Sequence, residues 1–236
     1  MNDFQEKIIA IVPAAGIGSR MGADVPKQYL KIAGQPILSL TLQVLLTHPR
    51  IDRVILALHP QDSYFSSLPE ARHPKLLSLV GGEERSDSVL ACLNRVELDC
   101  WAMVHDAARP CLTHSDIDKL IDSRGLFPQG AILASPVRDT MKRGDKQGCI
   151  EQTVCREQLW HALTPQIFPL VSLRDNLAKA LKANVNITDE ASAMEWAGIA
   201  PGLVTGRADN IKITHPDDLR LAELFLSQAE VEQAEG

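Results

Sequence analysis

Short apolar segments alternate with amphipathic segments along most of the chain. The apolar segments contain few charged residues and are followed by turn-forming residues, which is typical of strands buried in a parallel sheet. They comprise residues 7–12, 53–58, 76–80, 101–105 and 130–134. Repeated alternation of strands and helices predicts right-handed crossovers between the strands. We therefore expect an α/β fold with a mostly parallel sheet and helices on both of its faces.

The amphipathic segments between these strands predict helices. They comprise residues 37–46, 86–95, a segment that begins near Thr113, and residues 169–183, 188–198 and 216–229. Pro36 precedes the first of these helices, and proline is well tolerated at the first helical turn. Two further apolar pieces, residues 202–205 and 210–213, are expected to be strand-like.

The pattern changes between Val137 and Gln166. Polar and charged residues crowd the first part of this stretch, and residues 149–155 half-alternate. This combination predicts a hairpin whose turn lies near residues 144–148. Nothing in the local pattern buries the hairpin against the main sheet, so it is expected to project as an arm. Such an arm commonly pairs with its twin in a symmetric dimer, and an ordinary surface hairpin is the alternative.

Length, composition and charge narrow the picture further. The chain has 236 residues, of which 45% are hydrophobic, so we expect one domain over residues 1–236 with residues 137–166 as its arm. No apolar run approaches the roughly 20 residues of a membrane span, and no signal-peptide pattern is present. Five cysteines without a CxxC pair favour reduced thiols and a cytoplasmic location. The net charge of −6 disfavours a role in nucleic-acid binding.

A loop rich in small residues follows the first predicted strand, where open α/β sheets place ligands. Its glycines, within residues 13–31, fit neither the dinucleotide fingerprint nor the Walker pattern. The loop carries Arg20, Lys27 and Lys31 against Asp24 alone, which is a local charge of +2 in an acidic chain. Backbone N–H groups and fixed cations suit a polyphosphate. A solvated basic loop over a plain turn is the alternative.

Several motifs taken together resemble one enzyme family. They are Pro13-Ala-Ala-Gly-x-Gly-x-Arg-Met, Pro26-Lys-Gln, Gly81-Gly with Arg85 and Ser88-Val, His105-Asp-Ala-Ala-Arg-Pro, Ala134-Ser-Pro-Val-Arg-Asp-Thr, Leu163-Thr-Pro-Gln, Thr188-Asp-Glu-Ala-Ser and Gly206-Arg-Ala-Asp-Asn-Ile-Lys-Ile. Many nucleotidyltransferases share the first motif. The whole set, from Ile8 to Leu226, resembles the 2-C-methyl-D-erythritol 4-phosphate cytidylyltransferases. The resemblance implies a Rossmann-like α/β fold, a homodimer paired through a β-arm, and a place in the non-mevalonate route to isoprenoid precursors.

The implied reaction joins the phosphate of 2-C-methyl-D-erythritol 4-phosphate to the α-phosphorus of CTP and releases diphosphate. Because both reactants are anions, the barrier consists largely of charge repulsion and alignment. Protein cations, with Mg²⁺ or another divalent cation, supply the stabilisation. A phosphate dianion attacks without deprotonation and without a covalent intermediate, so His105 is expected to orient a strand end rather than act as a base.

The resemblance also assigns roles to individual positions. Arg20 and Lys27 are expected to stabilise the α-phosphorus and the leaving diphosphate, while Arg156 and Lys212 position the acceptor phosphate. Contacts with CTP are expected from Ala14, Ala15, Gly16, Gly82, Glu83, Ser88, Asp106 and Ala107. Contacts with the acceptor are expected from Arg109, Thr140, Arg156, Thr164, Thr188 and Lys212. The candidate metal ligands, directly or through water, are Asp106 and Asp209.

Without the resemblance, several of these residues have structural interpretations. Thr188 suits a helix N-cap, Lys212 suits an exposed strand, and Arg156 suits a solubilising charge on a hairpin edge. The two candidate metal-binding aspartates can instead pair with nearby arginines. Two other functions are also open. One is a CTP-dependent pyrophosphorylase for another polyol phosphate, such as ribitol 5-phosphate, and the other is a nucleotide-binding module without turnover.

Overall fold

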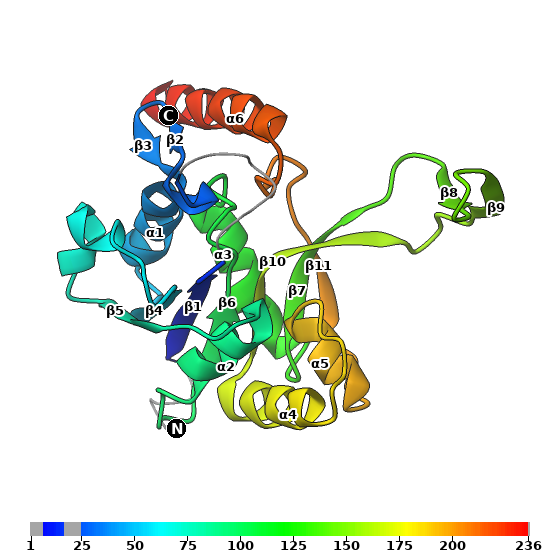
Figure 1. Ribbon diagram of the computed structural model, residues 1–236, viewed down its shortest axis with the longest axis horizontal. Helices are drawn as coiled ribbons and strands as arrows, with labels where there is room; N and C mark the ends of the chain where they lie inside the picture. Colours follow the sequence, from blue (N-terminus) through cyan, green and yellow to red (C-terminus); the bar gives the residue numbers. More distant parts are fainter. Residues whose placement is uncertain (1–6, 17–24, 236) are drawn as a thin grey trace.

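The structure is a computed structural model that describes residues 7–16 and 25–235, with side chains described as far as residue 228. A seven-stranded sheet runs through the molecule in the order β11-β7-β10-β6-β1-β4-β5 (Figure 1). Its strands are β1 (Ile8–Ala14), β4 (Arg53–Leu58), β5 (Leu76–Val80), β6 (Trp101–Val104), β7 (Ala131–Pro136), β10 (Trp160–Pro169) and β11 (Gly202–Thr205). Neighbouring strands pair in parallel, except that β10 runs antiparallel to both β6 and β7. The expected mostly parallel sheet is confirmed.

Helices cover both faces of this sheet, as expected (Figure 1). One face packs against α1 (Ile37–Thr47) and α3 (His114–Asp122). The other face packs against α2 (Arg85–Leu93), α4 (Leu170–Lys182) and α5 (Glu190–Trp196). Strand β1 serves both cores, because successive side chains of a strand point to opposite faces. Its residues Ile8, Ala10 and Val12 lie in the first core, whereas Ile9 and Ile11 lie in the second.

A third, smaller core lies beside the sheet. Helix α6 (Pro216–Glu235) packs there on the short hairpin of β2 (Lys31–Ile32) and β3 (Gln35–Pro36). Among the described residues, no helix combines the length and the apolar character that crossing a bilayer requires.

Most of the predicted segments are confirmed to within a few residues. Pro36 is the N-cap of α1, and Thr113 caps α3 by accepting a hydrogen bond from the backbone N–H of Asp116. The strand-like prediction for residues 210–213 was wrong. The backbone N–H of Ile213 donates to the carbonyl oxygen of Ala108, so this segment is tied to a loop rather than to a sheet.

Strand β10 was not predicted, because it lies at the end of the stretch where the hydrophobic pattern changes. Its first residues are partly exposed, and its pairing with β7 is interrupted between Ala162 and Gln166. The apolar signal is therefore concentrated in the second half of the strand. This strand reverses the direction of the chain within the sheet, which explains why the sheet is mixed.

The predicted hairpin is present as β8 (Met141–Gly144) and β9 (Ile150–Val154), which form a separate two-stranded sheet. Figure 1 shows this hairpin projecting far from the body of the molecule. Every residue of β8 is exposed, and the Ile150 side chain is 67% exposed. The projecting hairpin is thus confirmed, but the predicted arm of residues 137–166 extended too far, because residues 160–166 pair with β7 in the main sheet. Pairing of the arm with a second chain stays a prediction.

The order of the strands marks the place where a ligand is expected. From β1 the chain proceeds to β4 and β5 on one side, and then crosses to β6 on the other side of β1. The connections after β1 and β6 therefore diverge at the carboxyl edge of the sheet. Open α/β sheets bind ligands at such a switch point.

Candidate active site

A cavity lies at this carboxyl edge, between the end of β1, the turn after β5 and the loop after β6. Its lining residues are Pro13, Ala14, Ala15, Gly16, Lys27, Gln28, Gly82, Glu83, Glu84, Arg85, Ser88, Asp106, Ala107, Ala108 and Lys212. Every residue predicted to contact CTP is in this set, and so are Lys27 and Lys212. Arg20 lies outside the described residues. Segments that are far apart in the sequence therefore form one pocket, with cations on its wall.

The glycine turn after β5 is closely packed against β1 and α2. A Cβ atom on Gly81 would lie 2.6 Å from the Ser88 Oγ and 2.7 Å from the Cβ of Ala15, and one on Gly82 would lie 2.2 Å from the Cβ of Asp87. Larger residues at either position would force this turn or its neighbours to shift. The Ser88 hydroxyl accepts from the backbone N–H of Gly82 at 3.1 Å and donates to a backbone carbonyl at 3.2 Å, so it holds the turn in shape.

Lys27 is fixed at the opposite wall. It begins a single 3₁₀ turn, Lys27–Tyr29, in which the buried Gln28 donates from its Nε2 to the carbonyl oxygen of Ala14 at 2.9 Å. The Nζ of Lys27 lies 3.4 Å from the carbonyl oxygen of Ile213. Because Lys212 is the neighbouring residue, the two lysines reach the cavity from adjacent parts of its wall.

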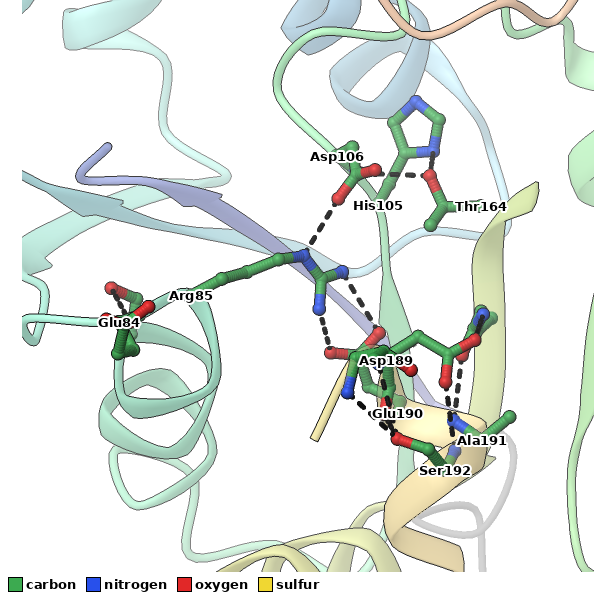
Figure 2. A network of polar contacts seen from close by, with 12 residues as sticks. Glu84, Arg85, His105, Asp106, Thr164, Asp189, Glu190, Ala191 and Ser192 are labelled. Atoms are coloured by element: carbon green, nitrogen blue, oxygen red, sulfur yellow. Dashed lines mark hydrogen bonds and ion pairs between the residues drawn. The ribbon is translucent and has the colours of Figure 1, made fainter. Parts of the chain in front are cut away.

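Asp106 contacts three cations, of which Figure 2 shows Arg85. Its Oδ1 accepts from the Nε of Arg85 at 2.9 Å, and its Oδ2 lies 2.8 Å from the Nζ of Lys212. The Nε of Arg109 lies 3.6 Å from the same Oδ2. Burial alone would raise the pKa of Asp106, but these cations hold that pKa well below its usual range. The carboxylate is therefore ionised near neutral pH.

A second set of buried groups fixes the backbone at Asp106. The Oγ1 of Thr164 accepts from the backbone N–H of Asp106 at 3.0 Å and lies 3.0 Å from the Nδ1 of His105. Burial lowers the pKa of His105 to about 4, so its imidazole is neutral near pH 7. Its Nε2 lies 3.1 Å from the carbonyl oxygen of Arg109. This geometry supports the expectation that His105 orients the end of β6.

Other predicted acceptor contacts lie outside the cavity. Thr140 and Arg156 are exposed on the arm, where the guanidinium of Arg156 donates to the carbonyl oxygen of Arg138. Thr188 is exposed just before α5. It is not the N-cap of that helix, because Asp189 holds this position and accepts from the backbone N–H of a residue in the first turn. Among the described residues that line the cavity, none belongs to the arm.

The two candidate metal ligands have different surroundings. Asp106 lines the cavity, whereas the carboxylate of Asp209 accepts from the Nε and Nη2 of Arg207 at 2.8 and 2.7 Å and does not line it. Within residues 7–16 and 25–235, no group of three or more histidine, cysteine, aspartate or glutamate side chains is placed to hold a metal ion. Asp106 is thus the described aspartate best placed to meet a cation carried by a bound nucleotide.

Several cavity residues were missed in the assignment of the site from sequence, namely Pro13, Gln28, Glu84, Arg85 and Ala108. Arg85 did carry a signal. It is the first residue of α2, where the helix dipole disfavours a positive charge, so an arginine there needs a partner that outweighs the dipole. The other missed residues line the cavity because the fold brings their segments there, and their residue types alone do not indicate this position.

The fold and the site together define a nucleotide-binding α/β enzyme with a cavity in which lysine side chains suit phosphate groups. The sequence matches the family described as 2-C-methyl-D-erythritol 4-phosphate cytidylyltransferase over residues 8–228. The chain belongs to this family, which confirms the resemblance seen in its motifs.

Individual relatives agree over nearly the whole chain. A 2-C-methyl-D-erythritol 4-phosphate cytidylyltransferase of Shewanella sediminis is 70% identical over 229 residues, which cover 97% of this chain and 98% of the relative. One from Shewanella halifaxensis is 67% identical and covers 97% of this chain and 100% of the relative. The crystal structure of the Francisella tularensis enzyme of the same name superposes with a TM-score of 0.82 at 36% identity, covering 93% of this chain and 99% of that one.

Proposed function

We propose that this chain transfers a cytidylyl group from CTP to 2-C-methyl-D-erythritol 4-phosphate, giving 4-diphosphocytidyl-2-C-methyl-D-erythritol and diphosphate. The observation that carries this proposal is that five of the eight family motifs, from the one at Pro13 to the one that ends at Ile213, contribute residues to one cavity on the carboxyl edge of the sheet, where Lys27 and Lys212 supply cations. Both substrates are anions, so fixed cations at the site supply the stabilisation of negative charge that the reaction needs most.

The proposed reaction is an in-line displacement. An oxygen of the acceptor phosphate forms a bond to the α-phosphorus of CTP, and the bond from this phosphorus to the diphosphate group breaks. Lys27, with Arg20, neutralises charge on the α-phosphate and on the departing diphosphate. No proton must be moved and no covalent intermediate with the protein forms, which agrees with a neutral, buried His105 that takes no part in the chemistry.

Binding of CTP is proposed to use the backbone more than the side chains. The tight turn at Gly81 and Gly82 brings the bare backbone of Gly82 to the cavity wall, where it can contact the edge of the cytosine base. Glu83 also lines the cavity, and a contact through its backbone would not depend on its side chain. The ionised Asp106 is suited to accept hydrogen bonds from the ribose hydroxyls.

The acceptor phosphate is proposed to lie against Lys212, which lines the cavity. Contacts of the acceptor with Arg109, Thr164 and Thr188, which are not part of the cavity lining, stay predictions. Lys212 is held at 2.8 Å by Asp106. This ion pair keeps the ammonium group of Lys212 at the cavity, on the part of the wall next to Lys27. The two phosphates would then meet beside these two positive charges, and alignment of this kind accounts for a large share of enzymatic rate enhancement.

A divalent cation, Mg²⁺ or a substitute, is proposed as the cofactor. The residues present fit it, because Mg²⁺ is commonly held by one or two carboxylates together with substrate phosphates. Asp106 would hold it directly or through water, and Asp209 is the weaker candidate because it does not line the cavity. When bound, the ion neutralises negative charge on the phosphates of CTP.

We further propose that the chain folds as one domain over residues 1–236 and forms a homodimer through the projecting part of its arm. Exposed Met141 and Ile150 support this, because apolar side chains on a projecting hairpin gain by packing against a second copy. Arg156 and Thr140 of each chain would then complete the site of the other. The free cysteines, of which Cys149 and Cys155 are exposed, support a cytoplasmic location.

The experiment that tests the proposed function is a panel of acceptors with CTP and Mg²⁺, in which diphosphate release is measured. We expect release with 2-C-methyl-D-erythritol 4-phosphate and much less with ribitol 5-phosphate. Preferential use of ribitol 5-phosphate would identify the alternative pyrophosphorylase. Binding of CTP in a calorimeter without diphosphate release from any acceptor would identify a binding module and contradict the proposal.

A further inference from the structure

Arg85 and Glu190 form a polar connection beneath the cavity that none of the roles above uses. Arg85 begins α2, directly after the glycine turn, and Glu190 begins α5. The Nη1 and Nη2 of Arg85 donate to the two carboxylate oxygens of Glu190 at 2.7 and 3.1 Å, while its Nε donates to Asp106. Figure 2 shows the arginine reaching across from α2 to both acids. One guanidinium thus joins three segments of the site.

The carboxylate of Glu190 is suited to hold this arginine in one orientation. Glu190 is 1% exposed, so its charge needs a partner inside the protein, and the two parallel hydrogen bonds from Arg85 provide one. Its helix is fixed in turn by Gln166 of β10. The Nε2 of Gln166 donates to Asp189 at 2.9 Å, and its Oε1 accepts from the backbone N–H of Ala191 at 3.0 Å.

The third donor of Arg85 determines which part of Asp106 faces the substrates. The Nε of Arg85 occupies Oδ1, so Lys212 pairs with Oδ2. A ribose hydroxyl or a hydrated cation that approaches Asp106 therefore meets the oxygen that Lys212 holds. The orientation of this carboxylate depends on a guanidinium that is itself fixed by a buried acid on another helix.

We infer that Arg85, held by Glu190, is a positioning residue for the nucleotide site. It fixes the orientation of Asp106 and ties the glycine turn to the start of α5, which follows Thr188. This inference rests on the proposed function, in which Asp106 binds the ribose or the cation of CTP. A lysine at position 85 keeps the charge but lacks the planar fork that reaches both acids at once.

The test is a comparison of Arg85→Lys and Glu190→Gln with the unmodified protein. For Arg85→Lys we expect the KM for CTP to rise about tenfold with kcat within about threefold, because Asp106 contacts CTP before the reaction as well as during it. Glu190→Gln should also raise the KM for CTP, by about threefold. A merely structural role would reduce the folded fraction, which lowers the apparent kcat and leaves KM unchanged.

Arg50→Lys is the matched control. Arg50 also bridges two carboxylates, those of Asp118 and Asp122, at 3.0 and 2.7 Å, but it does not line the cavity. We expect this variant to leave both kinetic constants unchanged. Melting temperatures of all three variants identify any that fails to fold, and Glu190→Gln keeps the test available if Arg85→Lys is unstable.

Calorimetric titration with CTP separates this inference from the proposed function. The Kd for CTP should rise about tenfold in Arg85→Lys whether or not the protein turns over with any acceptor. If the unmodified protein binds CTP but releases no diphosphate, the proposed function fails and the titration still decides the role of Arg85. An unchanged Kd and KM in a folded Arg85→Lys protein would overturn the inference.

Discussion

The cavity and the arm carry residues of the same proposed site, but their side chains are held very differently. At the cavity, Asp106 is 6% exposed and contacts three cations that come from three different segments. On the arm, Arg156 is exposed, and all of β8 faces solvent. This difference agrees with the proposed dimer. In that dimer, each chain supplies its own nucleotide site, and the arm of the other chain becomes ordered and completes the acceptor side of that site.

Substitutions at the cavity and on the arm should also differ in their energetic cost. Removing one member of a buried, hydrogen-bonded charge network costs several kcal/mol because the remaining charge is left unpaired. Exposed ion pairs and exposed apolar residues contribute far less to the folding of a single chain. Substitutions at the cavity should therefore affect activity or stability of the chain itself, whereas substitutions on the arm should act mainly through assembly.

The largest effect is expected at Lys27. Replacing it with alanine removes a fixed cation from the place where charge develops, so we expect kcat to fall by about 10²–10³. Its melting temperature should change little, because Lys27 lies at the surface of the cavity rather than in a core. Steady-state assays of diphosphate release measure this loss. A folded Lys27→Ala protein with nearly normal kcat would contradict the role given to this residue.

The arm gives the next test, which asks whether its residues serve the partner. We expect Arg156→Ala and Lys27→Ala chains to be weakly active alone and to recover activity when mixed. If each site takes Lys27 from one chain and Arg156 from the other, random pairing restores about a quarter of the normal activity. Subunit exchange is verified with differently tagged chains. Exchange without recovery would show that the arm does not complete a shared site.

Stability against pH distinguishes the buried network from the exposed arm. Burial lowers the pKa of His105 to about 4 from an ordinary value of 6.5. The unfolded chain therefore binds a proton more readily, and stability that is fully present above pH 6.5 is lost as the pH falls towards 4. This single group accounts for about 3 kcal/mol.

Urea unfolding at pH 7 and pH 4 measures this change, with His105→Gln as the comparison. We expect the variant to lose less stability than the unmodified protein over this interval, since it cannot take up the proton. Other titrating groups are present in both proteins and cancel in the difference. Equal losses would show that His105 is not the group responsible.

The smallest effect on the chain itself is expected at Ile150 on the arm. Because its side chain is 67% exposed, Ile150→Lys should change the free energy of unfolding of the monomer by less than about 0.5 kcal/mol. The same substitution should weaken the proposed dimer, which sedimentation velocity over a concentration series detects. A dimer of unchanged affinity would place the contact elsewhere.

Much of the fold was predictable because its strands are short, apolar and bounded by turn residues. The boundaries of β4 and β5 agree with the prediction to the residue. Strand β10 was missed because the first part of it is partly exposed, so its apolar signal is incomplete. Residues 210–213 gave the opposite error. They were predicted to form a strand because they are apolar, but the buried Ile213 lies in a loop.

The site was predictable where motifs mark the ends of strands. Residues such as Ala14, Gly82 and Asp106 follow predicted strands, and topology brings strand ends together. The link between Arg85 and Glu190 was not predictable, because it joins residues 105 positions apart in the sequence through a geometry that only packing determines. The proposed contribution of a second chain to the site depends on assembly, which the pattern of a single chain does not determine.

The central claim is that fixed cations at the carboxyl edge of the sheet align two phosphates that repel each other. A crystal structure with CTP and Mg²⁺ tests it most directly. We predict the cytosine against residues 81–83, the ribose at Asp106, and the α-phosphate within reach of Lys27. A triphosphate bound away from residues 14–27 would contradict the claim.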